Sequence, residues 1–260
     1  MYSVTQRVEM IKQPKSGYLK TGLFVKEQYN DDIQLNNNEL VDPSIAGMVV
    51  DYLTRTVTVA ESAKDAFRIS LLGATKLDFY RNTHDEIKKA IELVNEIKGL
   101  DDQSIINACH LACYDVCLRV SWEKYRSLGI EPDKYTISNI RTMVQRSIDF
   151  FNREGPLIRT NITFENGGYT DIISSGDADY LTETGLWDMK VSKHELNAQY
   201  TLQLLVYYLM GLRSDNETFN KVTKIGFFNP RQNLCYWIDV SFIPDSVISL
   251  VSREVIGYTE

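Results

Sequence analysis

Apolar residues recur at three- and four-residue spacings through most of the first half of the chain, which is the pattern of amphipathic helices. This pattern predicts helices over residues 44–56, 60–72, 84–97 and 103–128. The first helix has a clear start signal, because Asp42 can act as its N-cap and Pro43 suits its first turn. Residues 1–42 show no such period, and we expect only an extended arm or hairpin around Tyr18 to Tyr29.

The pattern changes at Gly129-Ile130-Glu131-Pro132, where glycine and proline interrupt regular structure. We therefore expect a mostly helical region over residues 1–130 and a second domain over residues 131–260. In the second domain the pattern predicts a helix at 138–152, strands at 157–165, 169–179 and 186–191, a helix at 195–212, strands at 223–228 and 234–240, and a last helix at 244–255. This order indicates an α/β fold built on a mixed sheet, with a helical N-terminal extension.

Composition places the chain among soluble globular proteins, with 43% hydrophobic and 24% charged residues. The formal net charge of −7 argues against a protein that coats nucleic acid through its overall charge, although a local basic groove or a bound metal can still hold phosphates. The N-terminus lacks the apolar run of a signal peptide, and no stretch approaches the roughly 18 apolar residues of a membrane span. We expect a cytoplasmic protein with no membrane partner.

Acidic side chains and one lysine stand close together on two of the predicted strands. Asp177 and Asp179 precede a short hairpin, and Asp188 and Lys190 follow it. Because side chains alternate along a strand, Asp188 and Lys190 share one face, and so do Asp177 and Asp179. Carboxylates placed in this way can share a divalent cation such as Mg²⁺, which takes a few oxygen ligands and keeps several waters. Such acids with one ammonium group are suited to metal-assisted hydrolysis of a phosphodiester.

Three motifs in this part of the chain resemble those of the PD-(D/E)XK nuclease superfamily, and in particular of its RecB-like branch. Gly176-Asp177-Ala178-Asp179 fits the branch's pattern of glycine, two residues and aspartate. Asp188-Met189-Lys190 fits the acid-x-lysine core. Gln203-Leu204-Leu205-Val206-Tyr207 fits the pattern of glutamine, three residues and tyrosine on the following helix. The resemblance covers about residues 136–240 and does not extend to the first 130 residues.

The resemblance implies a restriction-endonuclease-like αβββαβ core and an (exo)deoxyribonuclease that hydrolyses DNA with Mg²⁺ or Mn²⁺. It implies that Asp179, Asp188 and the backbone carbonyl of Met189 bind the metal. Lys190 would orient or deprotonate the attacking water, or stabilise the pentacoordinate phosphate. Gln203 would position the water, Lys190 or the nucleic-acid backbone, and Tyr207 would brace it. Relatives of this kind act in DNA recombination and repair, in phage replication and in defence against foreign DNA.

The assignment of individual site residues leaves alternatives open. Asp177 competes with Asp179 as the first metal ligand, and we prefer Asp179 because it lies nearer the hairpin and keeps the branch's spacing from the glycine. The proline that precedes this acid elsewhere in the superfamily is absent. Many relatives also carry an upstream acidic ligand, for which Glu154 and Glu165 are the candidates here.

Each of these side chains also has a purely structural interpretation. Asp188 and Lys190 fit a solvent-exposed strand face equally well, because charged groups near a hairpin are usually hydrated. Gln203 fits a surface amide of a helix, and Tyr207 fits a packed core side chain. The order and compact spacing of the three motifs favour the site.

The cysteines raise the question of an iron–sulfur cluster, which some RecB-like nucleases carry. Cys109, Cys113 and Cys117 repeat every four residues on one predicted helix, which spaces them about 6 Å apart per step along its axis. That arrangement is too elongated for one compact cluster, and Cys235 is far away in the sequence. We predict no iron–sulfur cluster and expect the thiols to be reduced and packed as apolar groups.

Two groups of basic residues are weaker candidates for substrate contact. Lys193 and His194 follow the strand of the acid-x-lysine motif, and four arginines surround the helix before the first strand: Arg141, Arg146, Arg153 and Arg159. A polar loop and scattered surface arginines are the simpler interpretation of these groups.

The main alternative function is a catalytically inactive nucleic-acid-binding or assembly subunit with the same fold, which the acidic net charge favours. A second alternative is an RNA-cleaving effector, in which RNA replaces DNA as the partner. The N-terminal helical region carries no catalytic signature. We expect it to serve as a lid, as a surface for a protein partner or a homo-oligomer, or as a clamp that limits which DNA end can enter.

Overall fold

The computed structural model describes residues 1–58, 62–128 and 131–259. Contacts divide the chain into two compact units, a sheet unit of Met1–Tyr29 with Phe150–Glu260 and a helical unit of Asn30–Asp149. These units differ from the expected ranges 1–130 and 131–260, because the first 29 residues pack with the C-terminal part of the chain. The expected boundary at Gly129-Ile130 lies outside the described residues.

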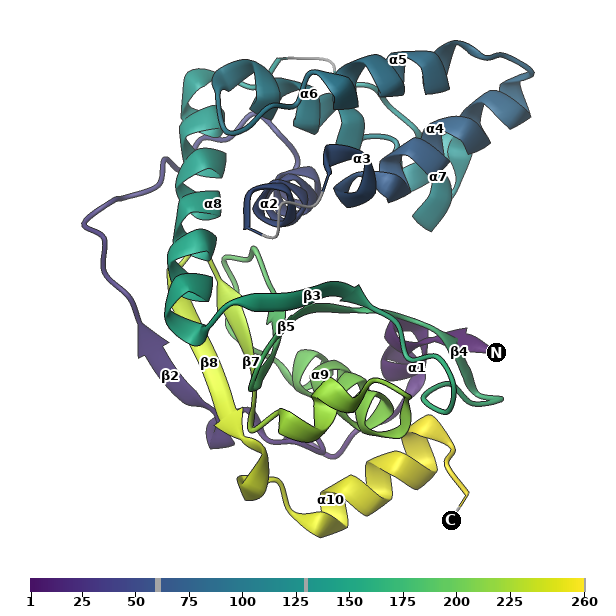
Figure 1. Cartoon of the computed structure of the whole chain (residues 1–260), viewed down its shortest axis with the longest axis vertical. Helices are drawn as coiled ribbons and strands as arrows, with labels where there is room; N and C mark the ends of the chain where they lie inside the picture. The colour runs from purple at the N-terminus through teal and green to yellow at the C-terminus, as the bar shows by residue number, and fades with distance from the viewer. Residues whose placement is uncertain (59–61, 129–130, 260) are drawn as a thin grey trace. The chain divides into compact units, whose positions relative to one another are not determined.

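The sheet unit is built on a mixed six-stranded sheet in the order β2-β8-β7-β6-β5-β3 (Figure 1). Its strands are β2 (Val25–Gln28), β3 (Leu157–Ile162), β5 (Ala178–Thr182), β6 (Gly185–Met189), β7 (Lys224–Asn229) and β8 (Leu234–Asp239). β6 and β7 are parallel, and all other neighbouring pairs are antiparallel. The expected α/β fold with a mixed sheet is thereby confirmed.

Both faces of the central strand β6 are covered. Leu186 belongs to the hydrophobic core that includes helix α9 (Ala198–Arg213). The ring of Trp187 meets Phe150, from the last turn of helix α8 (Lys134–Glu154), edge to face at 5.0 Å. Phe150 in turn stacks on Phe228 of β7 at 4.2 Å. Residues of β6 therefore alternate between the α9 side and the α8 side, as the period of a strand requires.

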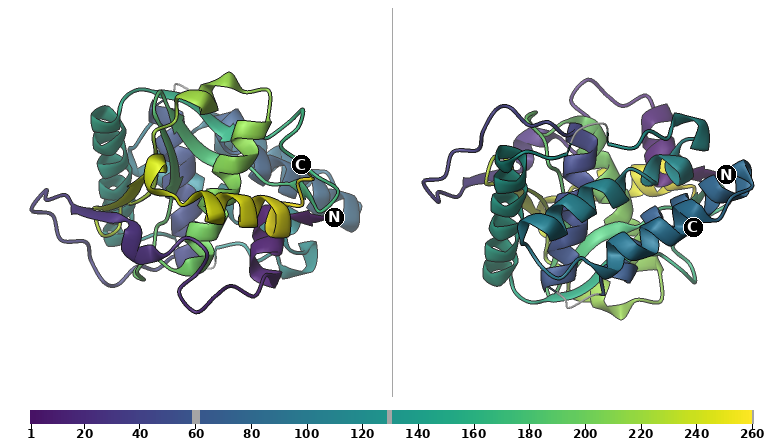
Figure 2. Two further views of the ribbon diagram at one scale, coloured as in Figure 1. Left: turned by 90° about the horizontal axis from the view of Figure 1, so that it is seen from below. Right: turned by 90° about the horizontal axis from the view of Figure 1, so that it is seen from above.

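The C-terminal elements form a further layer beyond α9. Helix α10 (Asp245–Leu250) continues into the π-helical segment η5 (Val251–Ile256), whose apolar residues join the same core as α9 (Figures 1 and 2). Two short 3₁₀ segments, η3 (Glu217–Lys221) and η4 (Val240–Phe242), flank the last two strands. Helix α9 is therefore enclosed between the sheet and the C-terminal helix, which explains why most of its residues are buried.

The first 29 residues contain more regular structure than expected. β1 (Tyr2–Ser3) pairs in parallel with β4 (Ile173–Ser175) as a separate two-stranded sheet, and helix α1 (Val4–Met10) follows directly. α1 is stabilised by a capping box, in which Ser3 and Gln6 bond each other's backbone N–H. The expectation of an irregular start is wrong here, because a seven-residue helix is too short to show a period. The expected arm near Tyr29 is confirmed in part, as the 3₁₀ segment η1 (Thr21–Leu23) and the edge strand β2.

The expected continuous strand over 169–179 is wrong. β4 ends at Ser175, and β5 begins at Ala178 in the main sheet. Between them Gly176 has a φ of +138°, and a Cβ there would come 2.7 Å from Cγ2 of Val4. The turn therefore needs a glycine, because it combines a positive φ with close packing against α1.

The helical unit contains α2 (Pro43–Thr58), α3 (Ala63–Ala66), α4 (Arg68–Arg81), α5 (Asp85–Asn95), α6 (Asp102–Ala112), α7 (Asp115–Arg119), the 3₁₀ segment η2 (Trp122–Lys124) and most of α8. Pro43 starts α2 as expected. The expected start of the next helix at Ala60 lies outside the described residues. The helix expected there is interrupted at Phe67, which lies between α3 and α4. Across the described residues, no helix is both long and apolar enough to span a bilayer.

The single helix expected over 103–128 is wrong, because it ends at Ala112 and a short helix α7 follows. A buried polar network explains the break. Asp115 accepts hydrogen bonds from the hydroxyls of Tyr52 and Ser70, both at 2.5 Å, and forms an ion pair with Arg119. A buried carboxylate is costly unless it is bonded in this way, so its position is decided by partners on α2 and α4.

Candidate functional site

The acid-x-lysine motif places an ion pair at the end of β6. Nζ of Lys190 lies 2.7 Å from Oδ2 of Asp188, and the Asp188 residue is only 3% exposed. The Lys190 side chain is 24% exposed, and its backbone N–H extends the β6–β7 ladder by donating to Phe228 O at 3.0 Å. The interpretation of Asp188 as part of a solvent-exposed face is therefore wrong, because that face is covered by α9.

Asp179 lies beside this pair on the neighbouring strand. The antiparallel register pairs Tyr180 with Trp187, which brings Asp179 next to Asp188 across the two strands. Oδ2 of Asp179 accepts a hydrogen bond from the backbone N–H of Met189 at 2.9 Å. Two carboxylates from adjoining strands thus converge at the same end of the sheet.

Helix α9 adds an amide and a phenol to the cluster. Lys190 Nζ donates to Oε1 of Gln203 at 3.3 Å, and Nε2 of Gln203 donates to the Tyr207 hydroxyl at 3.1 Å. The four-residue spacing places Gln203 and Tyr207 on one helix face, as expected. Because an ammonium group can only donate, Oε1 must face Lys190, and the amide NH₂ must then face Tyr207. Gln203 is therefore a bridging group and not a free surface amide.

The negative charges of the acids raise the pKa of both Lys190 and Tyr207. Burial alone would lower the pKa of the Lys190 ammonium, but the charges of Asp188 and Asp179 outweigh this and raise it above its ordinary value. Burial raises the pKa of the Tyr207 phenol well above its ordinary value, and the charges of Asp188, Asp179 and Asp177 raise it further. Both groups are thus protonated near neutral pH, so both can act as hydrogen-bond donors.

The competing acids occupy different places. Asp177 is exposed and precedes β5, so the expected strand alternation with Asp179 does not apply, although its charge still acts on Tyr207. Glu154 forms an ion pair with Lys224 at 3.4 Å. Glu165 is exposed beyond the end of β3. Of the acids considered as alternatives, only Asp177 is linked to the cluster by an interaction.

The donor atoms of this cluster are of a type that suits Mg²⁺ or Mn²⁺. Asp179, Asp188 and the backbone carbonyl of Met189 offer hard oxygen ligands, and Mg²⁺ commonly binds one or two carboxylates while it keeps several waters. No group of three or more His, Cys, Asp or Glu side chains is arranged as a metal cluster in residues 1–58, 62–128 and 131–259. The residues present fit a cation that is held by few protein ligands.

Two further side chains contact the cluster, and the sequence pattern did not point to them. Thr5 of α1 accepts a hydrogen bond from Gln203 Nε2 at 3.0 Å. Lys190 Nζ lies 4.9 Å from the ring centroid of Tyr200, one helical turn before Gln203. The spacing on α9 could have indicated Tyr200. Nothing in the sequence links Thr5 to Gln203, because 198 residues separate them.

Comparisons of the chain with known protein families, with curated proteins and with solved structures found no match. The family therefore stays a prediction. It depends on the three motifs and on the order of the elements that carry them.

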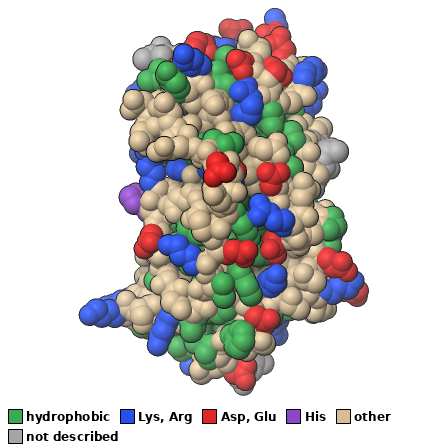
Figure 3. All heavy atoms as spheres, turned by 90° about the vertical axis from the view of Figure 1, so that its left-hand side faces the viewer, with side chains coloured by type: hydrophobic (Ala, Val, Ile, Leu, Met, Phe, Trp, Pro, Cys, Tyr) green, Lys and Arg blue, Asp and Glu red, His purple; other side chains and the backbone are tan. Residues whose placement is uncertain are grey.

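The remaining basic candidates mostly make structural contacts. Arg146 bonds Asp31 at 2.6 Å, Arg141 pairs with Asp102, and the Arg153 guanidinium lies 4.0 Å from the ring centroid of Tyr29. Lys193 and His194 lie in the exposed loop before α9, and Arg159 is exposed on β3. Acidic and basic side chains are interspersed on the face in Figure 3, so no single-sign field covers it.

The four cysteines are free and buried. Burial raises the pKa of the Cys109 thiol to about 12 and that of Cys113 to about 11, so both remain protonated thiols. The expected packing of these side chains as apolar groups is confirmed.

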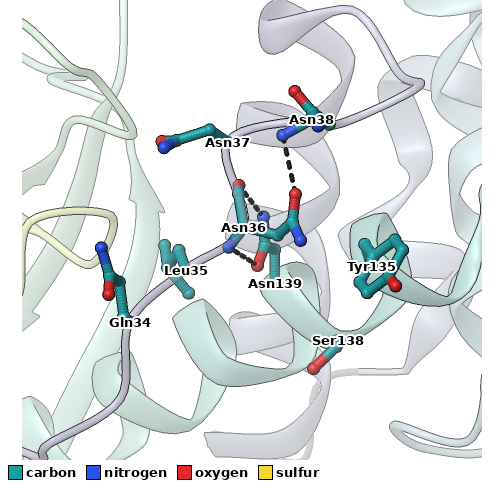
Figure 4. Close-up of a pocket in the computed structure, with 8 residues that line it drawn as sticks. All are labelled: Gln34, Leu35, Asn36, Asn37, Asn38, Tyr135, Ser138 and Asn139. Carbon is teal, nitrogen blue, oxygen red and sulfur yellow. Dashed lines mark hydrogen bonds between the residues drawn. The ribbon is translucent and has the colours of Figure 1, made fainter.

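A cavity of about 460 Å³ opens in the helical unit, and none of its lining residues is a predicted site residue (Figure 4). Uncharged side chains line it, from the loop around Asn37 and the start of α8. Asn139 bonds the backbone N–H and carbonyl of Asn36 and so holds the loop in place. Because its lining residues include no carboxylate, the cavity does not provide the acids of a hard-metal site.

Proposed function

We propose that the protein is a metal-dependent nuclease of the RecB-like PD-(D/E)XK type that hydrolyses DNA phosphodiester bonds. The observation that carries the proposal is the Lys190 ammonium, which lies 2.7 Å from Asp188 and donates to Gln203 beside Asp179. Acids, lysine and glutamine from three different elements meet at one point. A set of unrelated surface residues would not be expected to converge in this way.

The order of elements supports a restriction-endonuclease-like core in this proposal. Helix α8 is followed by β3, β5 and β6, then by α9 and by β7, which lies parallel to β6. β4 interrupts this order but belongs to a separate small sheet. The α9 crossover between two parallel strands places Gln203 directly over the end of β6.

The chain's own groups have defined roles in the proposed reaction. Asp179, Asp188 and the Met189 carbonyl would hold a divalent cation, which supplies Lewis acidity and a more acidic water. Lys190, held 2.7 Å from Asp188, would orient or deprotonate the attacking water, or stabilise negative charge on the phosphate. Gln203 accepts a hydrogen bond from the Lys190 ammonium and holds it in place. The Tyr207 hydroxyl accepts a hydrogen bond from the Gln203 amide and supports it.

The test offers end-labelled linear DNA and closed circular DNA to the protein with Mn²⁺. We expect wild type to degrade DNA, Lys190→Ala and Asp188→Ala to lose at least about a hundredfold in rate, and EDTA to abolish activity. Lys221→Ala, at an exposed lysine of η3 in the same unit, is the control and should retain activity. Loss of linear DNA alone identifies an exonuclease, whereas nicking of circles identifies an endonuclease.

Two outcomes would replace this proposal. Cleavage of RNA but not DNA would identify an RNA-cleaving effector. Metal-independent DNA binding with no loss of any substrate would identify an inactive binding or assembly subunit. The net charge of −7 favours this alternative modestly. A cytoplasmic setting in recombination and repair, phage replication or defence remains part of the proposal.

A further inference from the structure

The N-terminal helix contributes a side chain to the site on the sheet. Val4 and Val8 of α1 are buried in the core that contains α9, and Thr5 lies between them on the exposed side. Arg7 fastens the same helix to the C-terminal segment by donating to the carbonyl oxygens of Val255 and Glu254, at 2.9 and 2.7 Å. α1 is therefore a fixed part of the sheet unit, although only seven residues long.

Thr5 meets the site through the amide of Gln203. Nε2 of Gln203 donates to Thr5 Oγ1 at 3.0 Å and to the Tyr207 hydroxyl at 3.1 Å, while Oε1 accepts from Lys190. An amide with its two ends reversed would present NH₂ to the ammonium of Lys190, which cannot accept. The ammonium therefore decides which end of the amide faces Lys190, while the Thr5 and Tyr207 hydroxyls, which can each donate or accept, hold the amide in place from the other side.

We propose that Thr5 is a positioning residue for the catalytic cluster, which holds the Gln203 amide at the place where its Oε1 meets Lys190. This inference rests on the proposed nuclease function for its kinetic consequence, but the position of the amide does not depend on that function. Tyr207 supplies a second hydroxyl, so loss of Thr5 loosens the amide without releasing it.

The test compares Thr5→Val, which keeps the shape and loses the acceptor, with Thr5→Ser, which keeps the hydroxyl. For Thr5→Val we expect kcat to fall roughly five- to tenfold with little change in KM, as for the loss of one hydrogen bond. Thr5→Ser should restore kcat. NMR of the Gln203 side-chain amide provides a readout without cleavage, and its order parameter should fall in Thr5→Val alone.

The result that overturns the inference is an unchanged Gln203 amide signal in Thr5→Val, whatever the activity. If wild type proves inactive, the proposed function fails, yet the amide signal still decides the role of Thr5. Gln6→Ala serves as the control for helix α1, because it removes the capping box at the adjacent residue without touching Gln203. If Gln6→Ala loosens the Gln203 amide as much as Thr5→Val does, α1 acts only as a packed support.

A different observation concerns the outer face of α4 in the helical unit, which carries exposed rings. Phe79 is 79% exposed and Tyr80 is 52% exposed. Tyr80 stacks on Trp122 of η2 at 5.3 Å with an angle of 12° between the rings, and Phe79 meets Tyr80 edge to face at 5.4 Å. We call Phe79, Tyr80 and Trp122 the aromatic surface.

On the two segments that carry the aromatic surface, α4 and residues 122–126, basic side chains outnumber acidic ones, in a chain whose net charge is −7. Lys76 lies one helical turn before both Phe79 and Tyr80. Asp78 is the acid of α4, and it is buried and bonded to the backbone N–H groups of Glu86 and Ile87. Basic side chains follow on both segments, at Lys124, Arg126 and Arg81, and Arg81 is paired with Glu86 at 3.0 Å. Glu123 is the acid of η2.

We infer that the aromatic surface binds single-stranded nucleic acid by stacking bases on Phe79, with Lys76 and its basic neighbours beside the phosphates. Every base has a stackable face, and exposed rings next to cations are the usual equipment for this kind of binding. A duplex has its bases already stacked and should bind more weakly.

Fluorescence anisotropy with labelled oligothymidylate of about 16 nucleotides tests this binding. The buffer contains EDTA, so that the result is independent of cleavage. We expect Phe79→Ala to weaken binding roughly five- to hundredfold, as for the loss of one stacked base. Phe79→Tyr should keep the affinity, and Phe79→Leu should not, because leucine preserves apolar area without a ring. Phe242→Ala, which removes a phenyl group that is 73% exposed in the sheet unit, is the matched control.

Equal affinity of wild type, Phe79→Leu and Phe79→Ala for the oligonucleotide would overturn the inference. So would a concentration-dependent dimer of wild type that Phe79→Ala dissociates, since the surface would then bind a second copy of the chain.

Discussion

Oδ2 of Asp179 accepts a hydrogen bond from the backbone N–H of Met189 at 2.9 Å, which holds a carboxylate of β5 against the residue between Asp188 and Lys190. This bond gives Asp179 a structural role that is separable from metal binding. An amide oxygen can accept the same hydrogen bond, but it is a weaker metal ligand than a carboxylate.

Asp179→Asn should therefore keep the stability of the fold and lose the metal. We expect wild type to gain about 1.4 kcal/mol of unfolding free energy at ten times the metal's dissociation constant, and Asp179→Asn to gain almost nothing. Asp179→Ala should also lose about 1 kcal/mol without metal, because the Met189 N–H loses its partner. Urea unfolding with and without Mn²⁺ measures both effects. Full metal stabilisation of Asp179→Asn would exclude Asp179 as a ligand.

Asp188→Ala should destabilise the protein more than removal of both charges does. The single variant leaves the Lys190 ammonium without its closest carboxylate, at a cost of about 2 kcal/mol for a mostly buried pair. The double variant Asp188→Ala with Lys190→Met replaces the charge by an apolar chain and should recover at least half of that loss. Urea unfolding of the four proteins in this cycle measures the coupling. Additive effects would show that the ion pair contributes little.

Gly226→Ala should disrupt the sheet where Trp187 packs. A Cβ at Gly226 would come 2.5 Å from Cζ3 of Trp187 and 2.5 Å from the carbonyl oxygen of Tyr236. Such overpacking costs about 1–3 kcal/mol, which thermal unfolding detects as a lower Tm. Gly22→Ala is the control in the same unit, because nothing lies within 4 Å of its Cβ. Similar Tm values for the two variants would contradict the close packing.

The buried thiols should make the protein less stable at alkaline pH. Burial raises the pKa of Cys109 to about 12 and that of Cys113 to about 11, from 9.0 when unfolded. As pH rises above about 9, the unfolded chain loses protons that the folded chain keeps, so the free energy of unfolding falls. Urea midpoints between pH 8 and pH 10.5 measure this slope.

Cys109→Ala with Cys113→Ala is the variant that isolates this effect, and its slope should be shallower. Alkylation of the native protein at pH 8 should be slow for all four cysteines and rapid in urea, because each is buried. An identical pH slope in wild type and the double variant would assign the alkaline loss to other groups, such as Tyr125, whose pKa burial raises to about 12.

Relationships over a few residues could be predicted from the sequence. The alternation along β6 puts Asp188 on the α9 side and Trp187 on the α8 side, and the ion pair of Asp188 with Lys190 follows from the same period. The four-residue spacing of Gln203 and Tyr207 likewise brings their polar ends to 3.1 Å. These relations depend on backbone periodicity, which acts between near neighbours.

Predictions failed where a distant partner decides the local structure. The helix expected over 103–128 ends at Ala112 because Asp115 is held by Tyr52 and Ser70. The strand expected over 169–179 breaks at Gly176, where α1 packs closely. Local propensity cannot reveal either break, since the deciding groups lie far away along the chain.

The amino-acid order was sufficient to indicate a mixed α/β fold and the faces on which Asp188, Lys190, Gln203 and Tyr207 lie. Long-range packing was needed to bury Asp188, to place Asp179 beside it and to bring Thr5 against Gln203. The physical reason is that periodicity orients side chains within one element. Contacts between elements depend on which surfaces must be covered once the whole chain has collapsed.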